Sequence, residues 1–189
     1  MTASSPHLIK WPPRAGSQLR RELEEADALY DEAIGLLRGT VGPTRYHTQL
    51  AEGTAVHPTR ESMVYAAALL EISEGWRHDR ALRIVETILP LQDTDPTSPT
   101  CGLWPWYWEE PLAQMATPDW NWADFLGVQI IRILQGGSAP DAVRRRLMES
   151  LRLAAESICK RDVRLTYTNI TIMGPYVCWW SRQLPRVLM

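Results

Sequence analysis

Two kinds of helical segment alternate along this chain, and the alternation restricts its possible folds more than any other feature. One kind carries apolar residues every three or four positions on a single side, which is typical of helices at a surface. These one-sided segments are 17–38, 78–91 and 138–160. The other kind is apolar around most of its circumference, which indicates burial on several sides. These segments are 60–74, 119–135 and one that begins near residue 168. The sequence therefore predicts an all-α fold of about six helices.

Outer and inner helices in alternation indicate antiparallel helical hairpins. Such hairpins stack into a solenoid or close into an (α/α) toroid, and we expect part of a toroid. Thr59 is the expected N-cap of the second helix. We expect a lead-in at 1–16, a partial toroid domain at 17–177 and an aberrant C-terminal tail at 178–189.

Composition limits the possible binding partners and the cellular location of the protein. The net charge of −2 and the pI near 6.1 provide no global basic field for nucleic acid. No apolar run approaches the ~20 residues that span a membrane, and the first residues lack a signal peptide's apolar core. Cys101, Cys159 and Cys178 are far apart and form no CxxC, which argues against a disulfide framework and for a reducing compartment. We expect a cytoplasmic protein without metal or cofactor.

The stretch 102–125 is the first place to look for a site, since it contains five of the nine tryptophans together with several carboxylates. Prolines between 93 and 118 exclude one continuous helix, and a long loop in a compact domain is often functional. Its tryptophans argue against disorder. A purely structural role is the alternative, in which Trp120, Trp122 and Phe125 fill the core.

In a toroid, the loops that enter the inner helices meet at one rim. The loop containing His57 and Arg60, the aromatic stretch, and Tyr167–Asn169 would then share a site. His47 and His57 are not at a metal-ligand spacing, so exposed or backbone-bonded imidazoles are expected. The residues expected to act in catalysis are Tyr167, Asn169, Glu109, Glu110, Asp119 and Asp124. Those expected to bind substrate are Trp104, Trp106, Trp108, Trp120, Asn121, Arg60 and His57.

Two segments carry a resemblance to a known group of folds. Pro-Asp-Trp-Asn-Trp-Ala-Asp-Phe (118–125) and Arg-Asp-Val-Arg-Leu-Thr-Tyr-Thr-Asn-Ile-Thr-Ile-Met (161–173) resemble bacterial α/α-toroid proteins similar to heparinase II/III-like lyases and other carbohydrate-active toroids. The likeness covers about residues 17–177. It implies a toroid in which a tyrosine or histidine base acts beside an asparagine or arginine that neutralises a uronate carboxylate.

We expect a carbohydrate-active protein, either a polysaccharide lyase or a glycoside hydrolase. A lyase would use Tyr167 as base, with Asn169 or Asn121 stabilising the enolate-like charge. A glycosidase would pair Glu109 or Glu110 with Asp119 or Asp124, with the carboxyl groups ~5 Å apart for retention or ~6.5–9.5 Å apart for inversion. The alternatives are a non-catalytic module that binds a glycan or peptide, and an inactive fragment of a longer toroid.

The character of the sequence changes after Val177, where Cys178-Trp-Trp-Ser-Arg-Gln-Leu-Pro-Arg replaces the aliphatic residues expected of a buried helix. In a GC-rich gene, a shifted reading frame here gives an apolar run ending in glycine. We therefore predict a frameshifted, truncated copy, which would self-associate through an exposed apolar edge. The alternative is a natural terminus in which Trp179 and Trp180 dock on the body.

Overall fold

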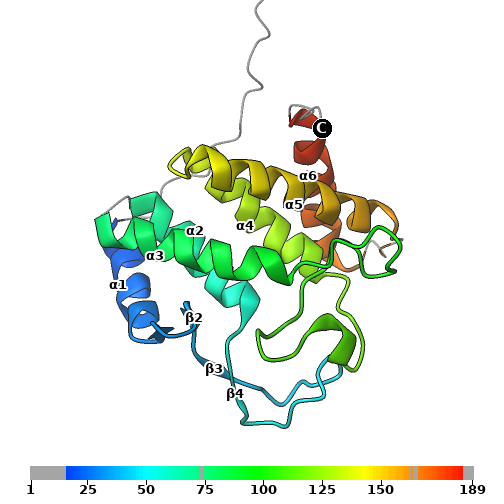
Figure 1. Ribbon diagram of the computed structural model, residues 1–189, viewed down its shortest axis with the longest axis horizontal. Coiled ribbons are helices and arrows are strands. Elements are labelled where there is room, and N and C mark those ends of the chain that lie inside the picture. Colours follow the sequence, from blue (N-terminus) through cyan, green and yellow to red (C-terminus); the bar gives the residue numbers. More distant parts are fainter. Residues whose placement is uncertain (1–15, 73–74, 162, 164–165, 185–189) are drawn as a thin grey trace, which may run out of the picture.

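The computed structural model describes residues 16–72, 75–161, 163 and 166–184, and these residues are mostly helical (Figure 1). They form six α-helices, two short 3-10 helices and two small antiparallel sheets. The α-helices are α1 (Gly16–Asp27), α2 (Thr59–Ile72), α3 (Gly75–Ile88), α4 (Trp122–Gly136), α5 (Asp141–Cys159) and α6 (Thr168–Gln183). The 3-10 helices are η1 (Leu89–Leu91) and η2 (Leu112–Gln114). The helical prediction is confirmed, but "all-α" omits the sheets.

Helices α2 and α4 occupy the interior, as their apolar circumferences predict. Helix α2 packs against α1, α3 and α4, and α4 packs against α2, α5 and α6. Figure 1 shows α1 and α6 at opposite ends of the group. Helix α5 buries a single face, which consists of Val143, Leu147, Ser150, Leu151, Ala154, Ala155, Ser157 and Ile158. It therefore matches the prediction of an outer helix.

Helix α6 differs from the inner helix that the sequence predicts, because it buries only one side. Its buried residues are Ile170, Gly174, Val177 and Trp180, whereas Ile172 is 66% exposed and Trp179 45% exposed. The contact with α4 is close, since a β-carbon on Gly127 would lie 3.0 Å from the side chain of Val177. The apolar residues on the other side face solvent. Self-association through them remains a prediction.

The first predicted helix is too long. Helix α1 ends at Asp27, and the chain then forms β1 (Tyr30–Asp31) and β2 (Leu36–Leu37), paired antiparallel. The Asp31 carboxylate accepts a bond from the Ala33 amide at 2.8 Å, and Gly35 has a φ of +87°, so the backbone turns there. The apolar residues at 30, 34 and 37 have the spacing of a helical stripe, but they belong to this hairpin. Strands β3 (Gly39–Thr40) and β4 (Ala55–Val56) form the second sheet.

The long loop after η1 is ordered by its own polar side chains. The Asp93 carboxylate accepts hydrogen bonds from the hydroxyls of Ser98 and Thr100. Gly102 has a φ of +94°, and a β-carbon there would lie 2.3 Å from the carbonyl oxygen of Leu153, so only glycine lets the loop approach α5 this closely. The expectation that this loop is ordered is confirmed.

Helix α6 continues through Cys178 to Gln183 and buries Trp180, so the predicted boundary at 178 falls inside a helix. The lead-in at 1–15 and residues 185–189 lie outside the described residues. The predicted frameshift remains a prediction. Within the part of the chain that the structure describes, no helix has the length and apolarity needed to cross a membrane.

Candidate functional site

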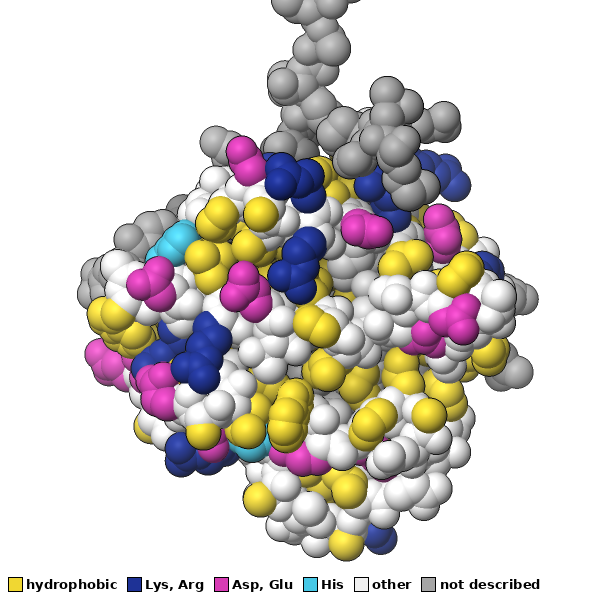
Figure 2. All heavy atoms as spheres, viewed as in Figure 1, with side chains coloured by type: hydrophobic (Ala, Val, Ile, Leu, Met, Phe, Trp, Pro, Cys, Tyr) yellow, Lys and Arg dark blue, Asp and Glu magenta, His cyan; other side chains and the backbone are white. Residues whose placement is uncertain are grey.

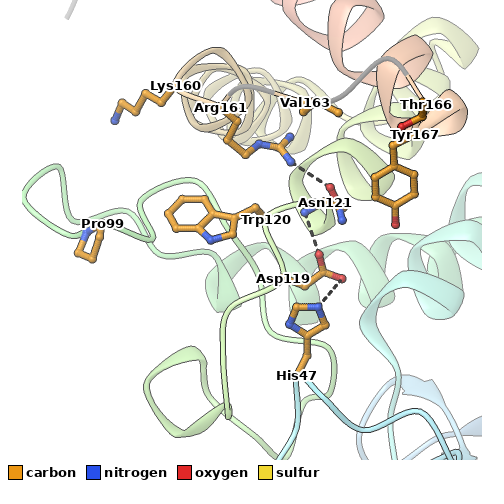
Figure 3. A pocket seen from close by; sticks show the side chains of 10 residues that line it. All are labelled: His47, Pro99, Asp119, Trp120, Asn121, Lys160, Arg161, Val163, Thr166 and Tyr167. Atoms are coloured by element: carbon orange, nitrogen blue, oxygen red, sulfur yellow. Dashed lines mark hydrogen bonds and ion pairs between the residues drawn. The ribbon is translucent and has the colours of Figure 1, made fainter.

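A pocket of about 820 Å³ lies where the turn before α4, the end of α5 and the residues before α6 converge (Figure 3). Ten residues line this His47 pocket: His47, Pro99, Asp119, Trp120, Asn121, Lys160, Arg161, Val163, Thr166 and Tyr167. Figure 3 shows Asp119 between His47 and Asn121, with Trp120 and Tyr167 on opposite sides of Asn121. Four of the thirteen predicted site residues are thus together: Asp119, Trp120, Asn121 and Tyr167. The segments before α4 and α6 share one pocket, whereas His57 and Arg60, which the rim prediction places in the same site, do not line it.

The imidazole of His47 is held in one orientation and one tautomer. Its Nδ1 lies 2.9 Å from the carbonyl oxygen of Thr117, and a carbonyl can only accept, so Nδ1 carries the proton. In the neutral ring, Nε2 is then a free base. This atom lies 3.9 Å from Oδ2 of Asp119, and the His47 side chain is only 16% exposed. A histidine fixed in this way is suited to removing a proton from a ligand in the pocket.

The carboxylate of Asp119 is fixed by two donors. The Trp106 indole N–H donates to Oδ2 at 3.1 Å, and the backbone N–H of Asn121 donates to Oδ1 at 2.9 Å. Asp119 is 6% exposed and precedes α4 by three residues. This carboxylate both shapes the turn into α4 and faces the free nitrogen of His47.

Arg161 connects the pocket to the buried side of α4. Its guanidinium donates to Oδ1 of Asn121 at 3.1 Å and forms an ion pair with Asp124. The Nε of Arg161 is buried and has no hydrogen-bond partner among the described residues. Burial raises the pKa of Asp124, and the charge of Arg161 lowers it in part. Since Asn121 accepts through its oxygen, its amide nitrogen remains a donor for a ligand.

Three predicted site residues are buried away from the pocket. Trp104 is 0% exposed and therefore has no face for a sugar. Glu110 is 2% exposed and accepts hydrogen bonds from the Thr48 hydroxyl at 2.5 Å and the Gln49 amide at 2.7 Å. Asp124 is also inaccessible, because it lies behind Arg161. Their burial prevents these three side chains from contacting a ligand in the His47 pocket.

His57 and Glu109 form a separate group, the His57 junction, together with Asp31. The His57 Nδ1 lies 2.5 Å from a carboxylate oxygen of Glu109, and its Nε2 lies 3.4 Å from Asp31. The junction forms because residues 57–59 pair with 106–108 through backbone hydrogen bonds. Exposed Trp108 packs edge-on to His57 at 6.4 Å. None of these residues lines the His47 pocket.

The remaining predicted site residues do not line the His47 pocket either. The Arg60 guanidinium lies over Trp122 and Phe125, 5.4 and 4.9 Å from the ring centroids, and pairs with Glu61. Trp106 acts through its bond to Asp119, and Asn169 is exposed in the first turn of α6. Thr59 does not cap α2 with its side chain. Its hydroxyl donates to the Pro105 carbonyl at 2.7 Å and accepts from the Trp122 indole at 2.9 Å.

Sequence reasoning missed Arg161 and Lys160 and did not include His47 in the site. The expectation of a backbone-bonded imidazole at His47 is confirmed, yet that bond is what leaves Nε2 free. Arg161 is part of the second segment that carries the toroid resemblance, which was the available signal. In the described part of the chain, no three His, Cys, Asp or Glu side chains gather in a way that could hold a metal ion.

One comparison with known proteins decides the family. The sequence model of a domain of unknown function, DUF8769, matches residues 17–184, which is most of the chain. The chain belongs to the DUF8769 family. No curated protein and no solved structure matches it. The DUF8769 match runs from the second residue of α1 to just beyond α6, and it includes all ten residues of the His47 pocket.

Proposed function

We propose that this protein is a lyase that cleaves a uronate-containing sugar chain by β-elimination in the His47 pocket. The observation that carries the proposal is the orientation of His47, whose Nε2 makes no hydrogen bond to the described residues and belongs to a pocket that also contains Asn121, Arg161 and Tyr167. A base, a carboxylate partner and a hydroxyl acid are the three groups that such an elimination requires.

Each step uses groups that are present. The amide nitrogen of Asn121, supported by Arg161, binds the uronate carboxylate and stabilises the negative charge that develops on it. His47 Nε2 takes the proton from C5, the released electron pair forms the C4–C5 double bond, and the C4–O glycosidic bond breaks. The Tyr167 hydroxyl donates its proton to the departing oxygen. The Asp119 carboxylate, 3.9 Å away, stabilises the imidazolium that forms at His47.

The other lining residues suit a sugar. Trp120 is 37% exposed and presents an indole face to the pocket, and such faces pack on sugar rings. Lys160 supplies a second cation at the margin of the pocket, which favours an acidic polysaccharide over a neutral one. The surface drawn in Figure 2 has acidic and basic side chains interspersed, so attraction of a polyanion relies on the local charges of the pocket.

Lyase chemistry is better supported than glycosidase chemistry. Hydrolysis of a glycosidic bond generally needs two carboxyl groups that flank it. Among the described residues, Asp119 is the only carboxylate that lines the pocket. Glu109 is engaged at the His57 junction, and Glu110 and Asp124 are buried.

The toroid is part of the same proposal. Helices α2, α4 and α6 would form the inner row, since α4 packs on both neighbours, and α3 and α5 would form the outer row. The His47 pocket lies at the N-terminal ends of α4 and α6, where a toroid collects the loops that enter its inner helices.

The test is incubation of the purified protein with a panel of uronate-containing and neutral polysaccharides. We expect ultraviolet absorbance from 4,5-unsaturated products with at least one uronate polymer. We expect Tyr167→Phe to reduce the rate by about 10²-fold or more, because the acid is lost. New reducing ends without that absorbance would indicate a hydrolase and contradict the proposal. Binding without any cleavage would indicate a glycan-binding module instead.

A further inference from the structure

The thiols of Cys159 and Cys178 lie next to each other. Their sulfur atoms are 3.0 Å apart, although the residues are 19 positions apart in the sequence. Cys159 is the last residue of α5, and Cys178 lies in the third turn of α6, where α5 and α6 pack together. A disulfide requires an S–S separation of about 2.0 Å, which is about 1 Å shorter than the distance here. Cys101, the third cysteine, is buried elsewhere.

The two thiols differ in accessibility. Cys159 is exposed, so a dissolved oxidant reaches it directly. Cys178 is half-buried, and its Sγ lies 3.6 Å from the carbonyl oxygen of Ala155. Burial raises the pKa of Cys178 to about 12, and the neighbouring Cys159 adds to the effect. An accessible thiol beside a shielded partner is the usual arrangement of an attacking and a resolving cysteine.

The segment between the two cysteines carries half of the His47 pocket. Five of the ten lining residues fall within 160–177: Lys160, Arg161, Val163, Thr166 and Tyr167. They include the arginine that supports Asn121 and the tyrosine proposed as the acid. A covalent link between the two cysteines would close a loop of chain that contains these five residues.

We propose that Cys159 and Cys178 form a reversible disulfide that controls the His47 pocket. The oxidant is a small-molecule disulfide of the glutathione type. The Cys159 thiolate attacks it, forms a mixed disulfide and releases one small thiolate. In the mixed disulfide Cys159 carries no charge that opposes ionisation of Cys178. Cys178 then loses its proton to solvent, and its sulfur attacks the Cys159 sulfur and releases the second. The protein loses two electrons and two protons, and one small disulfide becomes two thiols. In a reducing compartment such a bond is transient, which is typical of redox control.

The expected consequence is tighter binding. The disulfide restricts the segment that holds Arg161 and Tyr167, so less freedom is lost when a ligand orders their side chains. We expect the affinity for a uronate oligosaccharide to rise about threefold to tenfold on oxidation and to return on reduction. This second part rests on the proposed function, whereas formation of the disulfide does not.

The experiment treats the full-length protein with oxidised glutathione and maps its peptides by mass spectrometry without reduction. We expect one intramolecular cross-link between Cys159 and Cys178, with loss of two hydrogen atoms. Cys159→Ser and Cys178→Ser should abolish it, and the matched control Cys101→Ser should retain it. Hydrogen exchange at the amides of Lys160 and Arg161, which donate to carbonyls in the last turn of α5, should slow on oxidation.

The outcomes are distinguishable. A mixed disulfide that persists at Cys159, a link to Cys101, or a link only between molecules would overturn the disulfide. A correct cross-link with unchanged hydrogen exchange and unchanged oligosaccharide affinity would overturn the control of the pocket. The cross-link in a protein that produces no unsaturated sugar would sustain the disulfide while rejecting the lyase.

Discussion

Two histidines ten residues apart sit in opposite situations. At the His57 junction both ring nitrogens face carboxylates, with Glu109 at 2.5 Å and Asp31 at 3.4 Å. In the His47 pocket one ring nitrogen is bonded to a backbone carbonyl, and the other lies 3.9 Å from Asp119. The two side chains are almost equally exposed, at 14% and 16%. Burial therefore does not distinguish them. Within the described part of the chain, the two histidines differ in how many ring nitrogens are left without a hydrogen bond, which is none in His57 and one in His47.

The difference separates a structural role from a chemical one. His57 ties together three segments, because its partners come from β1 and from the loop before η2. Among the residues that the structure describes, His47 makes a single side-chain hydrogen bond, to the Thr117 carbonyl, and this bond fixes the orientation of its ring. A residue with one committed nitrogen and one free nitrogen can exchange a proton with a ligand, and a residue with two committed nitrogens cannot without breaking a contact.

The largest expected effect is on catalysis at His47. His47→Gln should lower kcat for elimination by about 10²–10⁴-fold, because the base is lost. The melting temperature of this variant should fall modestly, since it loses one hydrogen bond to a backbone carbonyl and the ring contacts with Tyr46 and Trp106. His57→Ala, assayed below its melting temperature, is the matched comparison and should retain near-normal kcat. Equal losses in the two variants would abolish the distinction between the two regions.

The next effect concerns the ion pair between Asp124 and Arg161, which holds Arg161 at the pocket. Asp124→Ala should reduce the free energy of unfolding by about 3–5 kcal/mol, because Arg161 loses its buried counter-charge. Denaturant unfolding measures this, with Asp79→Ala as the control, since the Asp79 side chain is 88% exposed. A change below about 1 kcal/mol would mean that Asp124 does not hold Arg161 in place.

A smaller effect is expected at the His57 junction. His57→Ala should reduce the free energy of unfolding by about 1–3 kcal/mol, because Glu109 and Asp31 are left without their shared partner. Thermal unfolding at constant pH measures the loss. Should the variant keep its stability and lose its turnover, the roles assigned to the two histidines would have to be exchanged.

The smallest effect is a pH dependence at Asp31. The Ala33 amide, followed by Arg38 and His57, lowers the pKa of Asp31 to about 2. The contribution of a carboxylate with a lowered pKa is present above the pKa of the unfolded chain and is lost as the pH falls toward the folded value. The difference in melting temperature between wild type and Asp31→Asn should therefore be present near neutral pH and shrink between about pH 4 and pH 2. Glu52→Gln, at an exposed carboxylate, is the matched control.

Patterns within single segments predicted most of the helices. Apolar periodicity placed α2, α4 and α5 within a few residues and predicted the start of α6 near Thr168. The same periodicity extended α1 too far, because a short hairpin can place apolar residues at helical spacings. The outward side of α6 was misjudged, since a run of apolar residues does not reveal whether a neighbour covers it.

The site was predicted less completely, because its contacts join distant segments. Asp119, Asn121 and Tyr167 were predicted because they lie at or next to the starts of predicted inner helices. The orientation of His47 depends on a carbonyl 70 residues away, and Asp124 is 37 residues from Arg161. Neither pairing produces a pattern that can be recognised within a single segment of the sequence. Composition also cannot show that Trp104 is buried while Trp120, in the same stretch, faces a pocket.

Gly102 has one more consequence. The long loop meets α5 backbone to backbone, since a β-carbon at Gly102 would collide with the Leu153 carbonyl. The loop therefore lies against the backbone of α5, next to the β-carbon of Ser157. Any side chain at 102 would move the loop away from α5 and displace Pro99 with it. The geometry of the pocket's outer wall is therefore set by the absence of a single carbon atom.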